Sequence, residues 1–424
     1  MKNVLIMADE NRRAAITILK VILLIFMIAY PLATYIAIFY HHEQKVSSAA
    51  LSDTIYYVAL DGNNNNPGTE SQPWQSISYA ASASSPISAG DTVYVKTGTY
   101  NEQIVVDKSG SSGDYITFSA YPGDFVTIDG KELSIEELPN PMGLIEISGK
   151  DYVKISGFRI INSPQVGVHI ADGSDHIIIE NNTINDSYRM SIKVGWGRAN
   201  NIFIFNNTVD RANVPKYEES ISVSEVEKIE ISYNTILNNI GEGIDIKDGS
   251  AYGSVHHNIV KNTSSVGIYL DAYEDYEHEI EIYHNTVTNA GYAGISIGTE
   301  RGGTIEDIKI HDNFVYDNMQ DGIEVANYVS PTSPGPGNAR NIEINNNVAY
   351  NNGHGGIEIG YDRTLTHNII VRNNILSQNK LYQLLIYNKS SITNVTVRNN
   401  LIDGFRNYAE QDESGIISRE FPVS

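Results

Sequence analysis

The chain contains no cysteine among its 424 residues, so it cannot form a disulfide, and its sequence does not indicate a redox compartment. Basic residues are also scarce, because 29 Lys and Arg stand against 51 Asp and Glu, and the formal net charge is -22. A strongly acidic surface repels nucleic acid and anionic lipid. The composition therefore argues against a nucleic-acid partner, and it says nothing about oligomeric state.

Long apolar runs are nearly absent, and residues 21–40 form the one uncharged stretch long enough to cross a hydrocarbon core of about 30 Å. Basic residues precede this stretch at Lys2, Arg12, Arg13 and Lys20, and only Lys45 closely follows it. The positive-inside rule then predicts a cytoplasmic segment 1–20, a transmembrane anchor 21–40 and an extracellular remainder at the cell surface. Small residues at 48–50 leave the alternative of a secreted protein whose segment 21–50 is cleaved as a signal.

A repeat dominates the chain after a polar linker at residues 41–54. Strands that end in Asn and an apolar residue recur from residue 151 onward, with spacings of 24 to 28 residues apart from one of 34 that contains a Pro/Gly-rich loop. Such a period is too short for separate domains and fits the coil of a solenoid. We predict one solenoid domain over residues 55–407 and a C-terminal tail at 408–424. The marker residues are Asn182, Asn207, Asn234, Asn258, Asn285, Asn313, Asn347, Asn374 and Asn400.

The regular spacing of these asparagines predicts an amide ladder at one corner of the coil. Several other asparagines stand in N-x-[ST] triplets, so glycosylation stays open for a host that performs it. Near the start of the solenoid, Pro73 suits a first helical turn, and Trp74, Ile77, Ala80 and Ala81 share one helical face. We expect an N-terminal helix here that caps the open end of the solenoid.

The same region carries a recognisable series of motifs. It reads YYVALDGNNNNPGT from residue 56, then PWQSI, GDTVYV, GTYNE and YITFSAYPGDFVTIDG. This series resembles the amino-terminal part of right-handed parallel β-helix proteins of the pectate-lyase-like superfamily, which includes polysaccharide lyases and glycoside hydrolases. The resemblance implies an all-β fold, a single-stranded right-handed parallel β-helix, and a carbohydrate-active protein whose partner is an extracellular polysaccharide.

One strand of each coil presents two outward positions that could carry chemistry. When these strands are aligned by their small residues, the first position is His169, Lys193, Ser222, Asp245, Tyr269, Ser296, Glu324 and Glu358. The second position is Ala171, Gly195, Ser224, Lys247, Asp271, Gly298, Ala326 and Gly360. Parallel strands lie about 4.8 Å apart, so Asp245, Lys247, Tyr269 and Asp271 would share one small surface. We take this group as the candidate reactive centre on the floor of a groove.

Residues on one side of this centre could bind substrate. Basic side chains gather between residues 187 and 217 in an otherwise acidic chain, and we expect Lys193, Arg198 and Arg211 to attract the carboxylates of an acidic glycan. Trp196 could offer a flat face to a sugar ring.

A polysaccharide lyase is the first of three open interpretations. Lys247 would remove the proton next to a uronate carboxylate, Tyr269 would act as the acid, and Ca²⁺ held by Glu242, Asp245, Asp248 or Asp271 would stabilise the intermediate. The segment GEGIDIKDGS at 241–250 resembles, in residue type, a segment of the chondroitinase-B and alginate lyase family. It departs from that family in spacing, and the following strand lacks the family's arginine.

A glycoside hydrolase is the second interpretation. The segment VGIYLDA at 266–272 resembles the nucleophile segment of β-helix β-xylosidases. That resemblance implies a nucleophile at Asp271 and an acid/base at Glu300, one coil further on. In the third interpretation the same charges form a solvated ladder on a binding or structural solenoid. Solvated or turn positions are then expected for His169, His256, His257, Glu324 and Glu358.

Overall fold

The computed structural model divides the chain into two units, Met1–Ser52 and Asp53–Ser424. It describes residues 54–134, 143–212, 218–327, 335–361, 365–387, 391–403, 409–412 and 415–418. The predicted cytoplasmic segment 1–20, the anchor or signal 21–40 and nearly all of the linker 41–54 lie outside the described residues. Within the described ranges, no helix combines the length and the apolar character needed to span a membrane.

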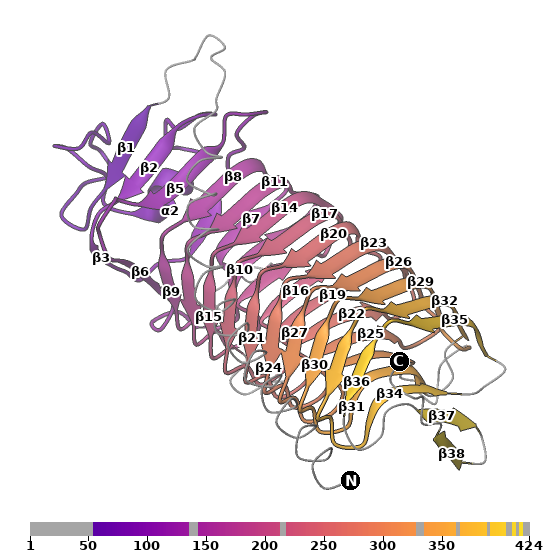
Figure 1. Ribbon diagram of the computed structural model, residues 1–424. Helices are drawn as coiled ribbons and strands as arrows, with labels where there is room; N and C mark the ends of the chain where they lie inside the picture. Colours follow the sequence, from indigo (N-terminus) through magenta and orange to yellow (C-terminus); the bar gives the residue numbers. More distant parts are fainter. Residues whose placement is uncertain are drawn as a thin grey trace, which may run out of the picture. The chain divides into compact units, whose positions relative to one another are not determined.

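The second unit is a right-handed parallel β-solenoid whose coils stack along one axis (Figure 1). Three long sheets run along it, and each coil contributes one strand to each sheet. The first sheet has 13 strands: β1 (Ile55–Val58), β2 (Thr92–Val95), β5 (Ile116–Ala120), β8 (Asp151–Ser156), β11 (Asp175–Glu180), β14 (Ala199–Phe205), β17 (Val226–Ser232), β20 (Ala251–His256), β23 (Tyr276–Tyr283), β26 (Thr304–His311), β29 (Asn338–Asn345), β32 (Leu365–Arg372) and β35 (Ile392–Arg398).

The second sheet, also of 13 strands, carries the candidate site. Its strands are β4 (Ile104–Val106), β7 (Gly143–Ser148), β10 (Val166–Ala171), β13 (Ile192–Val194), β16 (Ile221–Ser224), β19 (Ile244–Lys247), β22 (Ile268–Ala272), β25 (Ile295–Thr299), β28 (Ile323–Asn327), β31 (Gly355–Tyr361), β34 (Tyr382–Tyr387), β37 (Ala409–Asp412) and β38 (Gly415–Ser418). The last two form an antiparallel pair inside the segment expected to be an irregular tail, and β37 pairs with β34.

The third sheet has 12 short strands: β3 (Gly98–Tyr100), β6 (Val126–Asp129), β9 (Arg159–Ile161), β12 (Thr183–Asn185), β15 (Thr208–Asp210), β18 (Thr235–Leu237), β21 (Ile259–Lys261), β24 (Thr286–Thr288), β27 (Phe314–Tyr316), β30 (Val348–Tyr350), β33 (Ile375–Ser377) and β36 (Leu401–Asp403). All three sheets are parallel apart from the β37–β38 pair.

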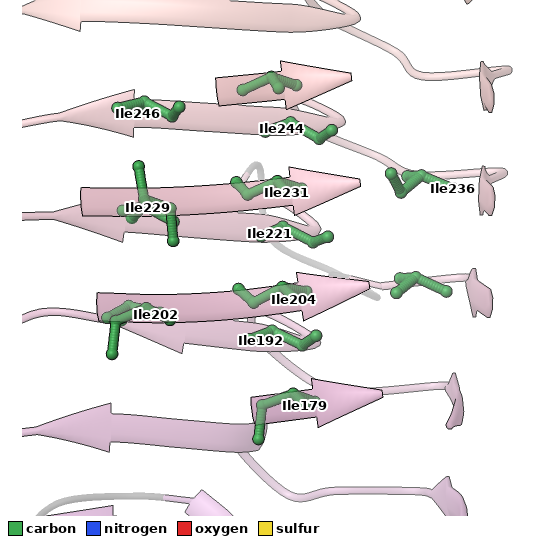
Figure 2. Close-up of a cluster of buried hydrophobic side chains, with 14 of the residues drawn as sticks. Ile179, Ile192, Ile202, Ile204, Ile221, Ile229, Ile231, Ile236, Ile244 and Ile246 are labelled. Carbon is green, nitrogen blue, oxygen red and sulfur yellow. The ribbon is translucent and has the colours of Figure 1, made fainter. Parts of the chain in front are cut away.

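Isoleucine and valine fill the interior of the solenoid. Alternate residues of each strand point inward, so Ile192, Ile202, Ile204 and their equivalents in the next coils are fully buried. Figure 2 shows these side chains stacked coil upon coil. Each buried isoleucine stabilises the fold by about 2 kcal/mol relative to an exposed one, and it gains this only because a neighbouring coil covers it.

The asparagine ladder is present and confirms the expected corner. In a typical step, Asn207 Nδ2 donates to Asn234 Oδ1 at 3.0 Å and to the Ile179 carbonyl at 2.8 Å. The residue before each ladder asparagine takes a positive φ between 53° and 58°, which turns the chain from the first sheet to the third. His257 occupies one of these positions, as its expected turn role requires. A second ladder, which the sequence analysis did not predict, joins Asn318, Asn352 and Asn379.

The expected capping helix is not formed at the predicted extent. Helix α2 covers only Ile77–Ala81, and it ends where Ser82 takes an extended conformation. Ser76 caps its first turn, and the Glu102 carboxylate accepts the Ile77 and Ser78 N–H groups at 2.8 and 3.0 Å. Trp74, Ile77, Ala80 and Ala81 are buried as predicted, but five residues are too few for an amphipathic cap, so the domain is essentially all-β.

Candidate active site

The second sheet brings the predicted outward row into register. Glu146, His169, Lys193, Ser222, Asp245, Tyr269, Ser296, Glu324 and Glu358 are Cα partners in successive strands. The second row runs through Ser224, Lys247, Asp271, Gly298 and Ala326 as expected. At its end, a register shift in β31 pairs Ala326 with Tyr361 instead of Gly360. The four residues of the predicted centre, Asp245, Lys247, Tyr269 and Asp271, therefore lie side by side on β19 and β22.

The outward row is buried, which overturns the expectation that His169, Glu324 and Glu358 are solvated. Their exposed fractions are 0%, 2% and 5%. Aromatic side chains lean across neighbouring coils and cover the row. An added Cβ on Gly298 would lie 2.4 Å from Tyr269 Oη, and one on Gly355 would lie 1.9 Å from the Tyr382 ring. The two glycines therefore leave room for the tyrosine rings.

Lys247 is held between two carboxylates. Its Nζ lies 2.8 Å from Asp245 Oδ2 and pairs closely with Glu219 Oε1. Burial lowers the pKa of Lys247, but the charges of Asp245 and Glu219 outweigh that effect and raise the pKa above its ordinary value. A lysine held in this way keeps its proton, which opposes the predicted role of Lys247 as a base.

Lys193 has a different environment from Lys247. Its Nζ donates to Ser224 Oγ at 2.8 Å and to Ser222 Oγ at 3.2 Å. Burial and the nearby Lys247 charge lower the pKa of Lys193 to about 8. Lys193 is therefore the lysine of this face that loses its proton close to neutral pH, and it is a better base than Lys247.

Asp271 and Glu300 form a pair of carboxyl groups with unequal surroundings. Burial, with the charges of Asp245 and Glu300, raises the pKa of Asp271 to about 9. Glu300 is more exposed, and it accepts a hydrogen bond from Tyr269 Oη at 3.1 Å. Burial also raises the pKa of Glu300, while the bond from Tyr269 lowers it. The arrangement therefore favours a proton on Asp271 at neutral pH, while the hydrogen bond from Tyr269 counters the rise in the pKa of Glu300.

The predicted calcium ligands do not fit the ion. Asp245 is tied to Lys247, and Glu242 Oε1 accepts a hydrogen bond from Ser265 Oγ at 2.6 Å. Across the residues that the structure describes, no group of three or more His, Cys, Asp or Glu side chains could hold a metal ion. Calcium takes six to eight oxygen ligands. Glu242, Asp245 and Asp248 therefore do not form a calcium site among the described residues.

Two arginines of the expected basic patch, Arg189 and Arg211, form ion pairs. Arg189 Nη2 lies 2.9 Å from Glu218, and Arg211 lies 2.8 Å from Asp186. Arg211 also pairs with Asp210 at 2.7 Å. The patch therefore has less net positive charge than the sequence suggested, because Glu218 and Asp186 reach it from neighbouring coils. Arg198 and Trp196 are exposed.

A second carboxyl pair was missed by the sequence analysis. Tyr382 Oη lies 3.0 Å from Asp321 Oδ1 and in close contact with Glu358 Oε2. A single hydroxyl hydrogen cannot serve two acceptors, so one carboxyl must carry a proton. Burial and the Asp321 charge raise the pKa of Glu358 to about 7, which identifies it as the protonated one. The aligned outward rows did not include Asp321, because it precedes its strand, as Glu219 does.

The chain matches two family models, and both describe a right-handed β-helix. The profile of the "Pel9A-like, right handed beta helix region" matches residues 56–220, and that of the "Right handed beta helix region" matches residues 143–307 and 276–402. The uncharacterized protein YwoF of Bacillus subtilis is 28% identical over 344 residues, 71% of this chain and 70% of YwoF. Pectate lyase PEL9 of Emericella nidulans is 28% identical over 224 residues, 49% of this chain and about half (52%) of the lyase.

Among solved structures, the family 28 exopolygalacturonase of Yersinia enterocolitica superposes with a TM-score of 0.61. The two chains are 12% identical, and the match covers 86% of this chain and 79% of the exopolygalacturonase. At this identity the likeness supports the fold alone.

Proposed function

Because this chain belongs to the right-handed β-helix family, within the pectate-lyase-like superfamily, we propose that it is an enzyme that hydrolyses the glycosidic bonds of a polysaccharide. The observation that carries this proposal is the pairing of Asp271 on β22 with Glu300, the residue after β25, because their different environments separate an acid from a base. A sequence relative named as a pectate lyase supports a glycan as the substrate.

Asp271 acts as the general acid in this proposal. Its raised pKa keeps the carboxyl protonated at neutral pH, so it can give its proton to the glycosidic oxygen as the bond to the anomeric carbon breaks. Glu300 stays ionised with the help of Tyr269, and it either attacks the anomeric carbon or takes a proton from the attacking water. These roles are the reverse of those implied by the β-xylosidase resemblance, because burial is deeper at Asp271 than at Glu300.

Lys247 has a positioning role in this mechanism. Its ammonium group pairs with Glu219 and Asp245, and Asp245 would otherwise add its full negative charge to the surroundings of Asp271. Asp245 also helps to raise the pKa of Asp271. The pair Lys247–Asp245 therefore adjusts the proton affinity of the general acid without touching the sugar.

β-Elimination on an acidic glycan is the second candidate, and Lys193 is the specific observation that favours it. With a pKa of about 8, Lys193 can accept the proton next to a uronate carboxylate, and the departing oxygen takes its proton from water. Tyr269 is not the acid of this candidate, because it bonds Glu300 beyond β25 while Lys193 bonds the serines of β16. The base in this candidate is Lys193 rather than Lys247. The relationship to pectate lyase PEL9 supports the same chemistry.

A polysaccharide panel separates the candidates. A hydrolase releases reducing ends without new ultraviolet absorbance, whereas a lyase produces unsaturated uronates that absorb near about 235 nm. Asp271→Asn and Glu300→Gln should each lower hydrolysis by about a thousandfold, and the exposed Asp114→Asn should leave it unchanged. Retention of a polysaccharide without any cleavage would instead mark a binding protein and would overturn both proposals.

The export of this enzyme is also a proposal. It depends on the uncharged residues 21–40 and on the four basic residues before them. A membrane-anchored form would sediment with membranes and lose its solenoid to protease added outside intact cells. A form cleaved near residue 50 would appear in the medium. Recovery of the whole chain from the cytosol would contradict both.

A further inference from the structure

Residues Gly195, Trp196 and Gly197 form a turn that displays an aromatic ring. All three have positive φ, at 139°, 64° and 102°. A Cβ added to Gly195 would lie 2.1 Å from Ser224 Oγ, and one added to Gly197 would lie 3.1 Å from the Asp172 Cα. The indole between them is 46% exposed. Positive φ is costly for a bulky residue.

The neighbouring coils hold this turn in place from both sides. The Asp172 N–H donates to the Trp196 carbonyl at 3.2 Å, and the Gly197 N–H donates to Glu225 Oε2 at 3.0 Å. Asp172 and Glu225 have φ of 54° and 58°, so their coils make similar turns with acidic residues that do not present an aromatic ring. Trp196 is therefore displayed by a rigid backbone rather than by a loose loop.

The indole of Trp196 packs edge-on against a buried histidine, His169. The ring of His169 lies 5.3 Å from the Trp196 ring at an interplanar angle of 71°. His169 Nδ1 lies 3.0 Å from Glu146 Oε2, and Glu146 in turn accepts the Gly143 N–H at 2.9 Å. His169 Nε2 is buried without a hydrogen-bond partner. Glu146 therefore holds the imidazole through Nδ1, and the aromatic ring that the imidazole contacts is the indole of Trp196.

We propose that Trp196 is a stacking platform for a sugar ring at one end of the sheet face that carries Asp271, and that His169 and Glu146 are positioning residues for its indole. This inference rests on the proposed action of Asp271 and Glu300 on a glycan. Trp196 follows β13, and its ring lies near His169 of β10. These two strands stand three and four strand spacings from β22, about 14 and 19 Å along the sheet. A chain of several sugar units that reacts at Asp271 can therefore reach Trp196, and a disaccharide cannot.

Intrinsic fluorescence tests the platform directly. The chain has two tryptophans, and the other one, Trp74, is 1% exposed and stacked on Tyr56. The full chain is titrated with digalacturonate, octagalacturonate, xylobiose and xylo-octaose. We expect a saturable change in emission with at least one of the long oligosaccharides and with neither disaccharide. The change should persist in Trp74→Phe and disappear in Trp196→Phe.

Kinetics with matched variants tests the role of the platform in catalysis. Trp196→Ala should lower kcat/KM about tenfold on the long form of the cleaved glycan and leave the disaccharide unaffected, since one stacking contact is lost. His169→Gln should give a smaller loss on the long form and a weaker emission change. Tyr252→Ala removes a comparably exposed aromatic ring (50%) from the first sheet and should change neither.

Two outcomes separate this inference from the proposed function. The platform is rejected, and the enzyme proposal stands, if Trp196→Ala slows cleavage equally on long and short substrates. The same conclusion follows if Trp196→Ala changes cleavage of neither. A saturable Trp196 signal without any cleavage keeps the platform and rejects the enzyme. If none of the four probes changes the emission of Trp196, the platform is rejected outright.

Discussion

Among single residues, Tyr269 of the first outward row contacts both Gly298 of the second row and Glu300. Its ring lies against Gly298, and its hydroxyl donates to Glu300. That hydrogen bond lowers the pKa of Glu300 and so opposes the effect of burial, which raises it. The hydroxyl therefore helps to keep Glu300 ionised, which both roles proposed for this carboxylate require.

Tyr269→Phe should shift the pH dependence of catalysis. Without the hydroxyl, the pKa of Glu300 rises further, so the acidic limb of the kcat/KM profile should move to higher pH. At the optimum we expect a loss of about tenfold. The measurement is a pH series with the cleaved polysaccharide, with Tyr252→Phe as the control. An unmoved acidic limb would mean that Glu300 is not the group that must ionise.

At the scale of a single strand and the corner that follows it, the asparagine ladder stabilises the fold. Asn258 is 1% exposed, and its Nδ2 donates to Asn285 Oδ1 at 3.0 Å and to the Ile231 carbonyl at 2.8 Å. Its Oδ1 accepts the backbone N–H and the Nδ2 of Asn234 at 2.9 and 3.0 Å. One side chain thus satisfies buried groups in both neighbouring coils.

Asn258→Ala should cost about 3 kcal/mol of unfolding free energy, because it leaves buried donors and acceptors unpaired on both sides. Urea denaturation followed by circular dichroism measures this loss. Asn262 lies in the same coil, is exposed, and has a φ of 60°, so Asn262→Gly keeps the backbone relaxed and serves as the control, with less than about 1 kcal/mol expected. Equal losses in the two variants would show that the ladder has no special stabilising role.

The repeat explains how much of this arrangement could be read from the sequence. A period of 24 to 28 residues fixed the ladder and placed Asp245 beside Tyr269 and Lys247 beside Asp271, because register follows from the period. It could not show that Tyr269 and Trp196 lean over adjacent coils, since side-chain direction along the solenoid axis is not periodic. The ion pair of Lys247 with Glu219 was missed for a related reason, because Glu219 precedes the aligned strand.

The expected N-terminal cap shows the same limit at another point. Burial of Trp74, Ile77, Ala80 and Ala81 followed from their spacing. The length of the helix did not, because it depends on the contacts of Glu102 and on the extended backbone of Ser82, neither of which the helical pattern encodes. Local geometry set by tertiary contacts is therefore the part that a periodic sequence leaves undetermined.

At the scale of the whole molecule, buried carboxyl groups connect folding to pH. Burial raises the pKa of Asp271 to about 9 from 3.8, of Glu277 to about 9 from 4.5, and of Glu358 to about 7 from 4.5. The folded chain then holds protons that the unfolded chain releases, so stability falls as pH rises through this window. His257, with a pKa lowered to about 4, opposes the trend below its ordinary 6.5, and Lys193 opposes it above about 8.

We therefore expect the melting temperature to be highest near about pH 5 and to fall toward about pH 8, with Glu277 as a large contributor. Glu277 is fully buried, accepts the Gly249 N–H at 2.6 Å, and its Oε2 has no hydrogen-bond partner. Glu277→Gln keeps that bond without a titrating proton, so it should match the parent chain near pH 4.5 and melt about 2–5 °C higher at pH 8. Calorimetry across this pH range measures the two melting temperatures. If the variant melts below the parent chain at pH 8, Glu277 is an ionised carboxylate that stabilises the fold, and the prediction is wrong.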